Sequence, residues 1–513
     1  MKVLKILAVT VAVLAVFVMG MTLLFPLPDQ NFAQSSERLA PDRDGPLAQA
    51  ILPATERHPG ESGIRPLADG RAAFAARAIL AREAVSSIDA QYYIWQDDTT
   101  GLMLLDALRD AADRGVRVRL LVDDNGIPGL DPLLAELDAM PTAEVRIFNP
   151  FTLRNPKLLS YAFSFGRLNH RMHNKSMTVD GVATIVGGRN IGDIYFAYGE
   201  GTHYFDVDAI GVGPIVDDVA GSFDTYWNSD AVWAAGTLLD PAGAPAIADL
   251  AARARASATG AGYQAAIRDS LLARQIDARD LNFEWGKAEL YVDDPLKGFG
   301  DVPDDRLVVE KLIALAGATR SSLDLVSAYF IPGSRGAEVL ENLARDGVRV
   351  RVLTNSLDAT DVMPVHAGYM KYRPGLVASG VELLELRAMR EERIDRSLPE
   401  ILAGSASGLH AKVFGFDGTR VFIGSYNLDP RSARLNTEMG VLVDSPAMAA
   451  SLSAQLDMPT FAYRVEAGED GTLIWIETSA DGTTRTYDAD PNTTAIQRVL
   501  ARIVGWLPVE WML

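Results

Sequence analysis

The strongest constraint on this chain is one pattern of five residue types that occurs twice at identical spacings. The two copies read HNKSMTVDGVATIVGGRN from His173 and HAKVFGFDGTRVFIGSYN from His410. Their fixed positions are His173, Lys175, Asp180, Gly187 and Asn190 in the first copy, and His410, Lys412, Asp417, Gly424 and Asn427 in the second. A single chance match of this kind has odds of about 10⁻⁴ over a whole chain. Two matches therefore indicate a duplicated functional element.

The sequence around the two motifs is duplicated as well. SIDAQYYIW has strand composition, LLDALRDAADRG has helical periodicity up to Gly115, and VRVRLLVDD is an apolar strand. SLDLVSAYFI, VLENLARDG up to Gly347, and VRVRVLTNS follow in the same order later, with Asp89 and Asp324 at matching places. The offset is far longer than the period of a repeat array. We therefore predict a duplicated α/β fold: two mixed, mostly parallel sheets flanked by helices and packed around a pseudo-two-fold axis.

These patterns divide the chain into six segments. We predict a transmembrane signal-anchor at 1–28, a tether with loops leading into the fold at 29–70, a first repeat at 71–230, a helical connector at 231–300, a second repeat at 301–450, and a C-terminal extension with a hairpin at 451–513. The charged stretch REERIDRSLPE, from Arg390, is either a solvated loop or a lid over the site. The apolar end WLPVEWML is typical of a docked tail.

The N-terminal segment carries no charge between Lys5 and Asp29. Its apolar run is about twenty residues long, enough for a helix to cross a bilayer. Lys2 and Lys5 precede the run, so the positive-inside rule predicts a cytoplasmic N-terminus and export of everything after it. A cleaved signal peptide and a buried soluble helix are the alternatives.

The composition narrows the choice of partners. The formal net charge is −19, whereas a domain that binds nucleic acid usually carries a basic face. The chain has no cysteine, which excludes disulfides, zinc–thiolate sites and cysteine nucleophiles. Asp123 and Asp124 are adjacent and would face opposite ways on a strand, so they are not a metal site. We expect no metal, no cofactor and no nucleic acid, and no obligate protein partner can be inferred from the sequence.

The spacing of the motif suits a phosphodiester substrate. A histidine and a lysine two positions apart on a strand point to the same face. If the copies pack around a two-fold axis, two histidines, two lysines and two asparagines converge on one point. The lysines would neutralise phosphate charge and the asparagine amides would donate hydrogen bonds. One histidine could then attack phosphorus while the other protonates the leaving oxygen.

Each histidine also needs an acceptor for its other ring nitrogen. Glu438 follows the second motif and Asp206 follows the first, both on predicted strands, and Asp208 is the alternative to Asp206. Asp180 and Asp417 belong to the catalytic motif, but each lies five residues beyond a lysine. We expect them to form structural ion pairs and not to touch substrate. The remaining histidines, His58, His170, His203 and His366, are expected at the surface or in packing.

The duplicated motif resembles that of the phospholipase D superfamily. SIDAQYYIW, GGRNIGDIYF and NLDPRSARLNTEMG are most similar to its bacterial cardiolipin synthase-like branch. The resemblance implies a ping-pong reaction through a phosphohistidine, with His173 as nucleophile and His410 as acid and then base. Asp206 and Glu438 would orient these histidines. The implied phosphate-binding residues are Lys175, Asn190, Lys412, Ser425 and Asn427, with Gly188 standing where the second copy has Ser425.

This resemblance also implies a substrate and a place in the cell. The expected reaction moves a phosphatidyl group to the glycerol hydroxyl of phosphatidylglycerol, with phosphatidylethanolamine as a second candidate substrate. Hydrolysis of phospholipids to phosphatidic acid is the alternative, followed by a nuclease or another phosphodiesterase. These activities share every catalytic residue and differ in the group that reaches the intermediate. The expected location is the bacterial inner membrane, with one span and an extracytoplasmic catalytic domain.

Overall fold

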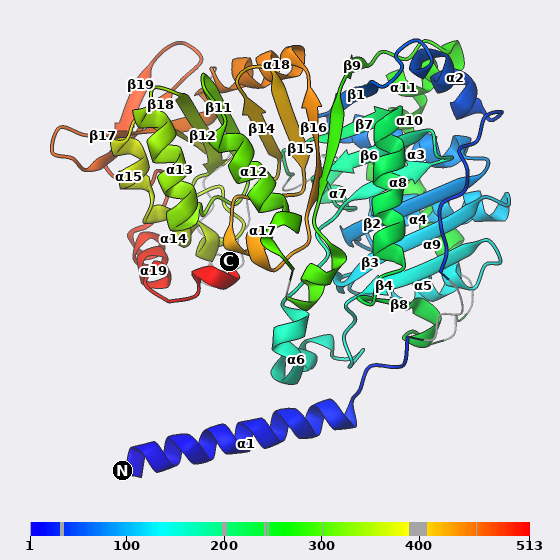
Figure 1. Ribbon diagram of the computed structural model, residues 1–513, viewed down its shortest axis with the longest axis horizontal. Coiled ribbons are helices and arrows are strands. Elements are labelled where there is room, and N and C mark those ends of the chain that lie inside the picture. The colour runs from blue at the N-terminus through cyan, green and yellow to red at the C-terminus, as the bar shows by residue number, and fades with distance from the viewer. Residues whose placement is uncertain are drawn as a thin grey trace.

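The described chain forms two α/β halves that lie side by side (Figure 1). A computed structural model describes residues 2–30, 35–196, 203–240, 243, 246–300, 302–388, 408–457 and 459–513. The charged stretch from Arg390, the candidate lid, lies outside the described residues.

The first half is built on a nine-stranded sheet of order β8-β4-β3-β2-β5-β6-β7-β1-β9. Its strands are β1 (Ser62–Leu67), β2 (Ser87–Ile94), β3 (Arg117–Gly126), β4 (Ala143–Phe148), β5 (Ser176–Val179), β6 (Ala183–Gly187), β7 (Asp208–Val212), β8 (Val232–Ala234) and β9 (Glu284–Gly286). Its helices are α2 (Pro46–Thr55), α3 (Gly70–Glu83), α4 (Thr99–Asp113), α5 (Asp131–Asp138), α6 (Tyr161–Leu168), α7 (Asp193–Phe196), α8 (Pro214–Trp227), α9 (Ile247–Ala256), α10 (Ala258–Arg268) and α11 (Leu271–Ala278).

The second half is built on a ten-stranded sheet of order β10-β16-β15-β14-β11-β12-β13-β17-β18-β19. Its strands are β10 (Ala288–Val292), β11 (Ser322–Ser327), β12 (Arg349–Asn355), β13 (Glu382–Leu386), β14 (Lys412–Phe416), β15 (Arg420–Gly424), β16 (Met439–Asp444), β17 (Ala462–Ala467), β18 (Leu473–Thr478) and β19 (Thr484–Tyr487). Its helices are α12 (Val308–Gly317), α13 (Gly333–Arg345), α14 (Met363–Met370), α15 (Arg373–Ala378), α17 (Pro430–Arg434), α18 (Pro446–Leu456) and α19 (Ala495–Gly505).

The duplication predicted from the sequence is present in the strand order. The run β4-β3-β2-β5-β6-β7 of the first sheet matches β13-β12-β11-β14-β15-β16 of the second. In each half a buried aspartate pairs with a buried arginine of the neighbouring parallel strand: Asp89 with Arg119, and Asp324 with Arg351. The halves share an apolar cluster that joins Ile64 and Val186 of one sheet to residues such as Val413 of the other.

The sheets are mixed, as expected, but the prediction that they are mostly parallel is wrong. Among the strands that the structure describes, only β2-β3-β4 and β11-β12-β13 pair in parallel, and the other strand pairs are antiparallel. The reason lies in the motifs themselves. Asp180-Gly181 and Asp417-Gly418 have positive φ angles and form tight turns, which join β5 to β6 and β14 to β15 as hairpins.

The segments outside the two repeats are more structured than the sequence indicated. Residues 29–70 include α2 and β1, and residues 231–300 supply β8, β9 and β10 as well as helices. The hairpin expected near the C-terminus is formed by β18 and β19. The C-terminal end of the chain packs against Arg431, whose backbone N–H donates to the carbonyl of Leu513 at 2.8 Å.

The N-terminal helix α1 (Lys2–Leu24) projects from the body and contacts α6 (Figure 1). Within the part of the chain that the structure describes, no helix is long and apolar enough to cross a membrane. The predicted transmembrane span is therefore not confirmed.

Candidate active site

Each motif histidine is held by the backbone of the opposite half. The N–H of His173 donates to the carbonyl of Thr437 at 2.9 Å, and the N–H of Thr437 donates to the carbonyl of Arg171 at 2.9 Å. In the matching place, the N–H of His410 donates to the carbonyl of Phe205 at 2.7 Å. Backbone hydrogen bonds from the opposite half therefore hold both histidines in equivalent ways, which gives the site its pseudo-two-fold symmetry.

The two carboxylates expected to orient the histidines do contact them, and the pairing is crossed. Nδ1 of His173 lies 2.8 Å from Glu438 Oε2, and Nδ1 of His410 lies 2.5 Å from Asp206 Oδ2. Each carboxylate thus comes from the copy that does not contain its histidine. Because Nδ1 is occupied in both rings, Nε2 is the nitrogen left for chemistry.

Asp208, the alternative to Asp206, has a different role. Its carboxylate is fully buried and pairs with Arg77 at 2.9 Å and with Arg189 at 3.3 Å. It therefore belongs to the ion-pair network beneath the site and does not contact a motif histidine.

Both motif lysines are buried beside their own histidines. Lys175 Nζ donates to the carbonyl of His173 at 2.7 Å, and Lys412 Nζ donates to the carbonyl of His410. Burial lowers the pKa of Lys175 well below its usual value, and Glu438 opposes that shift. The pKa of Lys412 is also lowered by burial, with Asp206 opposing. Two buried lysine side chains next to the histidines form a site suited to a negatively charged group.

The two asparagines close the motif at the ends of β6 and β15. Asn190 uses its amide oxygen to accept from the N–H of Ile94 at 3.1 Å, which leaves its NH₂ group as a donor. The amide oxygen of Asn427 is buried and has no hydrogen-bond partner among the described residues. Both side chains therefore retain unused hydrogen-bonding capacity beside the histidines.

Ser425, which the sequence predicted to bind phosphate, directs its hydroxyl to a carboxylate in this structure. Its hydroxyl is fully buried and donates to Glu438 Oε2 at 2.5 Å. In the first copy this place is held by Gly188, where an added Cβ would lie 2.3 Å from Asp206 Oδ1. The shorter Asp206 approaches the backbone directly, whereas the longer Glu438 leaves room for a serine. The two carboxylates are therefore supported differently.

Asp180 and Asp417 are structural, but they do not form the expected ion pairs. Asp180 Oδ1 accepts from the backbone N–H groups of Ser86 and Ser87 at 2.8 and 2.9 Å. Asp417 Oδ1 accepts from the N–H groups of Arg320 and Ser321 at 2.8 and 2.7 Å. Both carboxylates thus fix the turn after their motif strand to the chain that enters β2 or β11. Neither touches a histidine.

The electrostatics of the two histidine–carboxylate pairs differ. Burial lowers the pKa of His173 well below its usual value, and Lys175 adds to the shift. Burial also raises the pKa of Glu438 to about 7. Burial and Lys412 lower the pKa of His410, but Asp206 opposes this. Burial alone would raise the pKa of Asp206, yet His410 and neighbouring cations hold it below its usual range. One pair thus has a readily protonated carboxyl and the other an ionised one.

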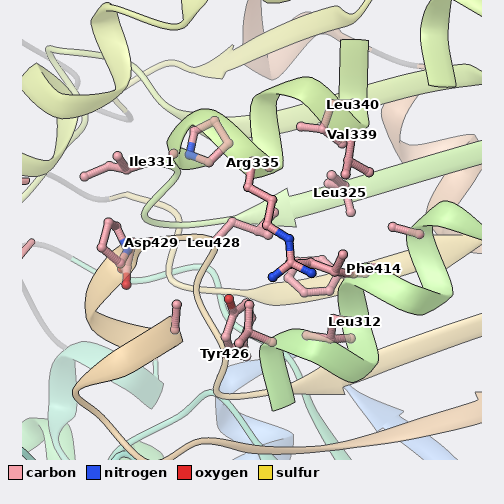
Figure 2. A pocket seen from close by; sticks show the side chains of 18 of the residues that line it. Leu312, Leu325, Ile331, Arg335, Val339, Leu340, Phe414, Tyr426, Leu428 and Asp429 are labelled. Atoms are coloured by element: carbon pink, nitrogen blue, oxygen red, sulfur yellow. The ribbon is translucent and has the colours of Figure 1, made fainter. Parts of the chain in front are cut away.

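Hydrogen bonds through Ser432 connect Glu438 to the wall of an apolar cavity on one face of the second sheet (Figure 2). The cavity has a volume of about 290 Å³ and lies between α12, α13 and the strands β11 and β14. Asp429 lies on its wall, and burial raises the pKa of that carboxyl to about 7. Asp429 accepts from the N–H of Ser432 at 2.7 Å, and the hydroxyl of Ser432 donates to Glu438 at 2.7 Å.

Sequence reasoning missed the aromatic surroundings of the histidines. The ring of Tyr93 lies 5.2 Å from that of His173, and the rings of Tyr195 and Tyr204 each lie 5.2 Å from that of His410. The hydroxyl of Tyr204 donates to Asp361 at 2.9 Å. Tyr93 and Tyr195 lie in SIDAQYYIW and GGRNIGDIYF, two stretches that carry the family resemblance, and that signal could have identified them.

Asp123 and its equivalent Asn355 were also missed as positioning residues. Asp123 Oδ2 accepts from the N–H of Met172 at 2.8 Å, and Asn355 Oδ1 accepts from the N–H of Leu409 at 2.8 Å. Each therefore holds the residue just before a motif histidine. The described residues include no group of three or more histidine, aspartate or glutamate side chains that could hold a metal ion.

Comparison with known proteins agrees with this geometry. The family described as "Cardiolipin synthase, PLD-like domain" matches residues 79–227 and 312–458, one match for each half. The chain belongs to this family. It is thus a member of the phospholipase D superfamily, in the cardiolipin synthase branch, and an enzyme of the phosphatidyltransferase type.

Relatives of this branch match most of the chain. Cardiolipin synthase C of Escherichia coli (strain K12) is 43% identical over 471 residues, which cover 91% of this chain and 99% of the relative. Cardiolipin synthase B of the same strain is 26% identical over 364 residues, covering 70% and 71%. The crystal structure of phosphatidylserine synthase from Haemophilus influenzae Rd KW20 has a TM-score of 0.57 at 15% identity, covering 88% and 95%. This last match supports the fold alone.

Proposed function

We propose that this member of the cardiolipin synthase branch transfers a phosphatidyl group from one phospholipid to the glycerol hydroxyl of phosphatidylglycerol, through a phosphohistidine on His173. The observation that carries the proposal is the crossed arrangement of two histidines, each with Nδ1 on a buried carboxylate, beside two buried lysines. A paired nucleophile and acid beside fixed positive charge is what displacement at a phosphodiester requires.

The first step loads the enzyme. Nε2 of His173 attacks phosphorus, the bond from phosphorus to the headgroup oxygen breaks, and Nε2–H of His410 gives its proton to that oxygen. Lys175 and Lys412 stabilise the charge that builds on the non-bridging oxygens. With phosphatidylglycerol as donor, the leaving group is glycerol. For these transfers, His173 must be neutral and His410 must be protonated at the start of the reaction.

The electrostatics favour this division of labour. The pKa of His173 is held well below its usual value by burial and by two lysines, so its ring is neutral and nucleophilic. The pKa of His410 is lowered less strongly, and the ionised Asp206 beside it favours the protonated ring. A phosphodiester in the site adds negative charge and raises the pKa of both rings.

The second step releases the product. His410, now neutral, takes the proton from the glycerol hydroxyl of phosphatidylglycerol, whose oxygen attacks phosphorus while the bond to His173 breaks. The products of the two steps are cardiolipin and glycerol. Each histidine is only 7% exposed, which limits attack on the intermediate by bulk water.

Product analysis tests the reaction. The purified full-length chain is incubated with phosphatidylglycerol, with and without phosphatidylethanolamine, and the lipids are identified by mass spectrometry. We expect cardiolipin together with free glycerol, and neither product from the control His173→Ala. Phosphatidic acid without cardiolipin would instead identify a hydrolase. Cleavage of an oligonucleotide with no lipid product would identify a nuclease.

The proposed phospholipid substrate and the N-terminal helix together indicate where the enzyme is located. The helix α1 is 23 residues long, and its described side chains Val9, Val13 and Phe17 are 63%, 61% and 48% exposed. Exposed apolar side chains along a helix are stable in lipid, so we propose that α1 attaches the enzyme to the bacterial inner membrane with its catalytic halves outside the cytoplasm. A C-terminal reporter that is active only outside the cytoplasm should be active, and one active only in the cytoplasm should be silent. The reverse result would contradict this topology.

A further inference from the structure

A second, larger cavity lies between the second sheet and α18, where the two halves meet. Its volume is about 600 Å³. Most of its wall is apolar, from Val326, Leu353, Leu386, Val413, Val421, Ile423, Met448, Leu452, Leu456 and Phe461. The polar groups are few: Ser451 and Gln455 on α18, Glu284 on β9, and Asp206, whose carboxylate is already used by His410. A space of this size with a mostly apolar wall and few polar groups suits an apolar ligand.

The cavity reaches the catalytic pair along two stretches of chain. Phe205 and Val207 line it on either side of Asp206, and Leu409 and Ala411 line it on either side of His410. The side chain of Phe205 is 47% exposed, so the wall is open to solvent at this end. An apolar group that enters here lies next to the histidine that protonates the leaving group.

The duplication shows that this space is not a general feature of the fold. The turns Gly213-Pro214 and Ser445-Pro446 start the matching helices α8 and α18. In the first half, Phe223 and Trp227 of α8 pack with Leu121, Phe148 and Met172 into an apolar cluster. Leu353, Leu386 and Leu409 hold the matching places in the second half and line the cavity instead. Gln455 stands where α8 has Phe223, so the space that the first half fills is open in the second.

We propose that this cavity holds one fatty acyl chain of the phospholipid whose phosphate lies between His173 and His410. The proposal rests on the proposed function and extends it to the apolar part of the substrate. A methylene group takes roughly the volume of a water molecule, about 30 Å³, so a chain of 16 to 18 carbons needs roughly 500 Å³. The cavity of about 600 Å³ accommodates one such chain.

The cavity between α12 and α13 is a poorer fit for the same ligand (Figure 2). Its volume of about 290 Å³ is about half that of the larger cavity. Arg335 and Glu310 also line it, and they form an ion pair with two contacts of 2.7 and 2.8 Å. It lies on the opposite face of the second sheet, since Leu325 and Phe414 line it whereas their neighbours Val326 and Val413 line the larger cavity.

A cavity-filling substitution tests the proposal. Gln455→Phe copies the aromatic residue of the first half into the cavity, and Ala454→Phe adds the same ring at an exposed neighbouring position of α18 that does not line it. Rates are compared for dioleoyl-phosphatidylglycerol and for glycerophosphoglycerol, which has the same phosphodiester without acyl chains. We expect Gln455→Phe to lower the ratio of the long-chain rate to the chain-free rate at least tenfold. The ratio for Ala454→Phe should equal that of the wild type.

The chain-free substrate separates the two proposals. If the wild type cleaves neither substrate, the proposed function fails. If it cleaves both but the rate ratio is the same in Gln455→Phe and the wild type, the acyl-chain site is wrong while the function stands. For the wild type with lipids of increasing chain length below their critical micelle concentration, we expect KM to fall roughly fourfold per methylene. A KM independent of chain length would also overturn the proposal.

Photolabelling decides the question without a variant. Phosphatidylglycerol with a diazirine near the end of one acyl chain is bound to the full-length chain in detergent, irradiated and mapped by mass spectrometry. We expect labels on α18 and its neighbours, at Met448, Leu452 and Phe461. Labels between α12 and α13, or labels confined to α1, would contradict the assignment.

Discussion

At the scale of single residues, the main result is that two chemically similar histidines are given different surroundings. His173 faces Glu438, whose carboxyl has a raised pKa and is held by two serines. His410 faces Asp206, which approaches the backbone where Gly188 leaves space. The asymmetry therefore comes from the extra methylene of Glu438 and the serine hydroxyls that support it, all on one side of a nearly symmetric site.

The first prediction at this scale concerns the covalent intermediate. His410→Ala keeps the nucleophile and lacks the acid, so a phosphodiester with a p-nitrophenolate leaving group should still load it. His173→Ala should form no adduct with any substrate. Turnover of phosphatidylglycerol should fall by several orders of magnitude in both, because the two residues act as a unit. Mapping of the acid-labile adduct by mass spectrometry checks this, and an adduct on His410 would reverse the assignment.

The second prediction concerns pH. A carboxyl with a pKa of about 7 is protonated below that pH, so the ionised form of Glu438 that accepts Nδ1–H of His173 is lost as the pH falls through 7. We expect kcat/KM of the wild type to rise through this range. Glu438→Gln should reduce kcat/KM by roughly 10- to 100-fold and remove the limb of the pH profile near pH 7, where kcat/KM of the wild type rises. Asp206→Asn should also lose activity but keep that limb, because the pKa of Asp206 lies far below it. A limb that persists in Glu438→Gln would assign it to another group.

At the scale of secondary-structure elements, the motif is a strand, a turn and a second strand, and its aspartate serves the turn. The backbone at Asp180 has a φ of 52° and that at Asp417 the same value, a conformation that Asp and Asn adopt more readily than most residues. Each carboxylate then receives N–H groups of the chain that enters the neighbouring strand. The third motif residue therefore maintains the geometry that places the lysine.

This role predicts a loss of stability. Asp180→Ala leaves buried N–H groups unpaired and strains the turn, which should cost about 2 to 4 kcal/mol of unfolding free energy. Asp180→Asn keeps an acceptor oxygen and tolerates the positive φ, so it should recover most of that loss. Thermal unfolding of the two variants checks this. Equal unfolding temperatures for Asp180→Ala and the wild type would show that these bonds do not stabilise the turn.

The predicted and observed secondary-structure elements show which features could be predicted from the sequence and which could not. The spacing of His173 and Lys175 and its return at His410 identified the family and a duplicated α/β fold, because a motif is local in the sequence. The sheets were wrongly predicted to be mostly parallel because strand–helix alternation was extended to the whole sheet, although a tight turn such as Asp180-Gly181 between two strands favours an antiparallel hairpin. The crossing of the carboxylate pairs could not be predicted, since it depends on how two halves pack and no local pattern encodes that.

At the scale of the whole molecule, several elements with exposed apolar side chains lie toward one edge. Figure 1 places α1, α6, α19 and the chain end along the same lower edge. Arg431 connects them to the site region, because its side chain donates to the carbonyl of Asn169, after α6, and to that of Met512. Exposed apolar side chains on these elements and in the short turn before α6 are Leu158, Leu159, Phe165, Ile496, Val499, Ile503, Trp506, Leu507 and Trp511. This edge is suited to contact a bilayer.

The corresponding prediction uses the two tryptophans near the C-terminus. Trp506 is 83% exposed and Trp511 is 56% exposed, and tryptophan favours the interface between lipid and water. Trp506→Ser combined with Trp511→Ser should lower turnover on phosphatidylglycerol vesicles about tenfold and leave turnover on a short-chain, monomeric lipid within about twofold of the wild type, because only the first substrate requires docking. The control Leu271→Ser removes a side chain that is 58% exposed on α11, at the opposite edge in Figure 1, and should change neither rate. Equal losses on vesicles and monomers in the tryptophan variant would mean that these residues support the fold around Arg431 and not the contact with lipid.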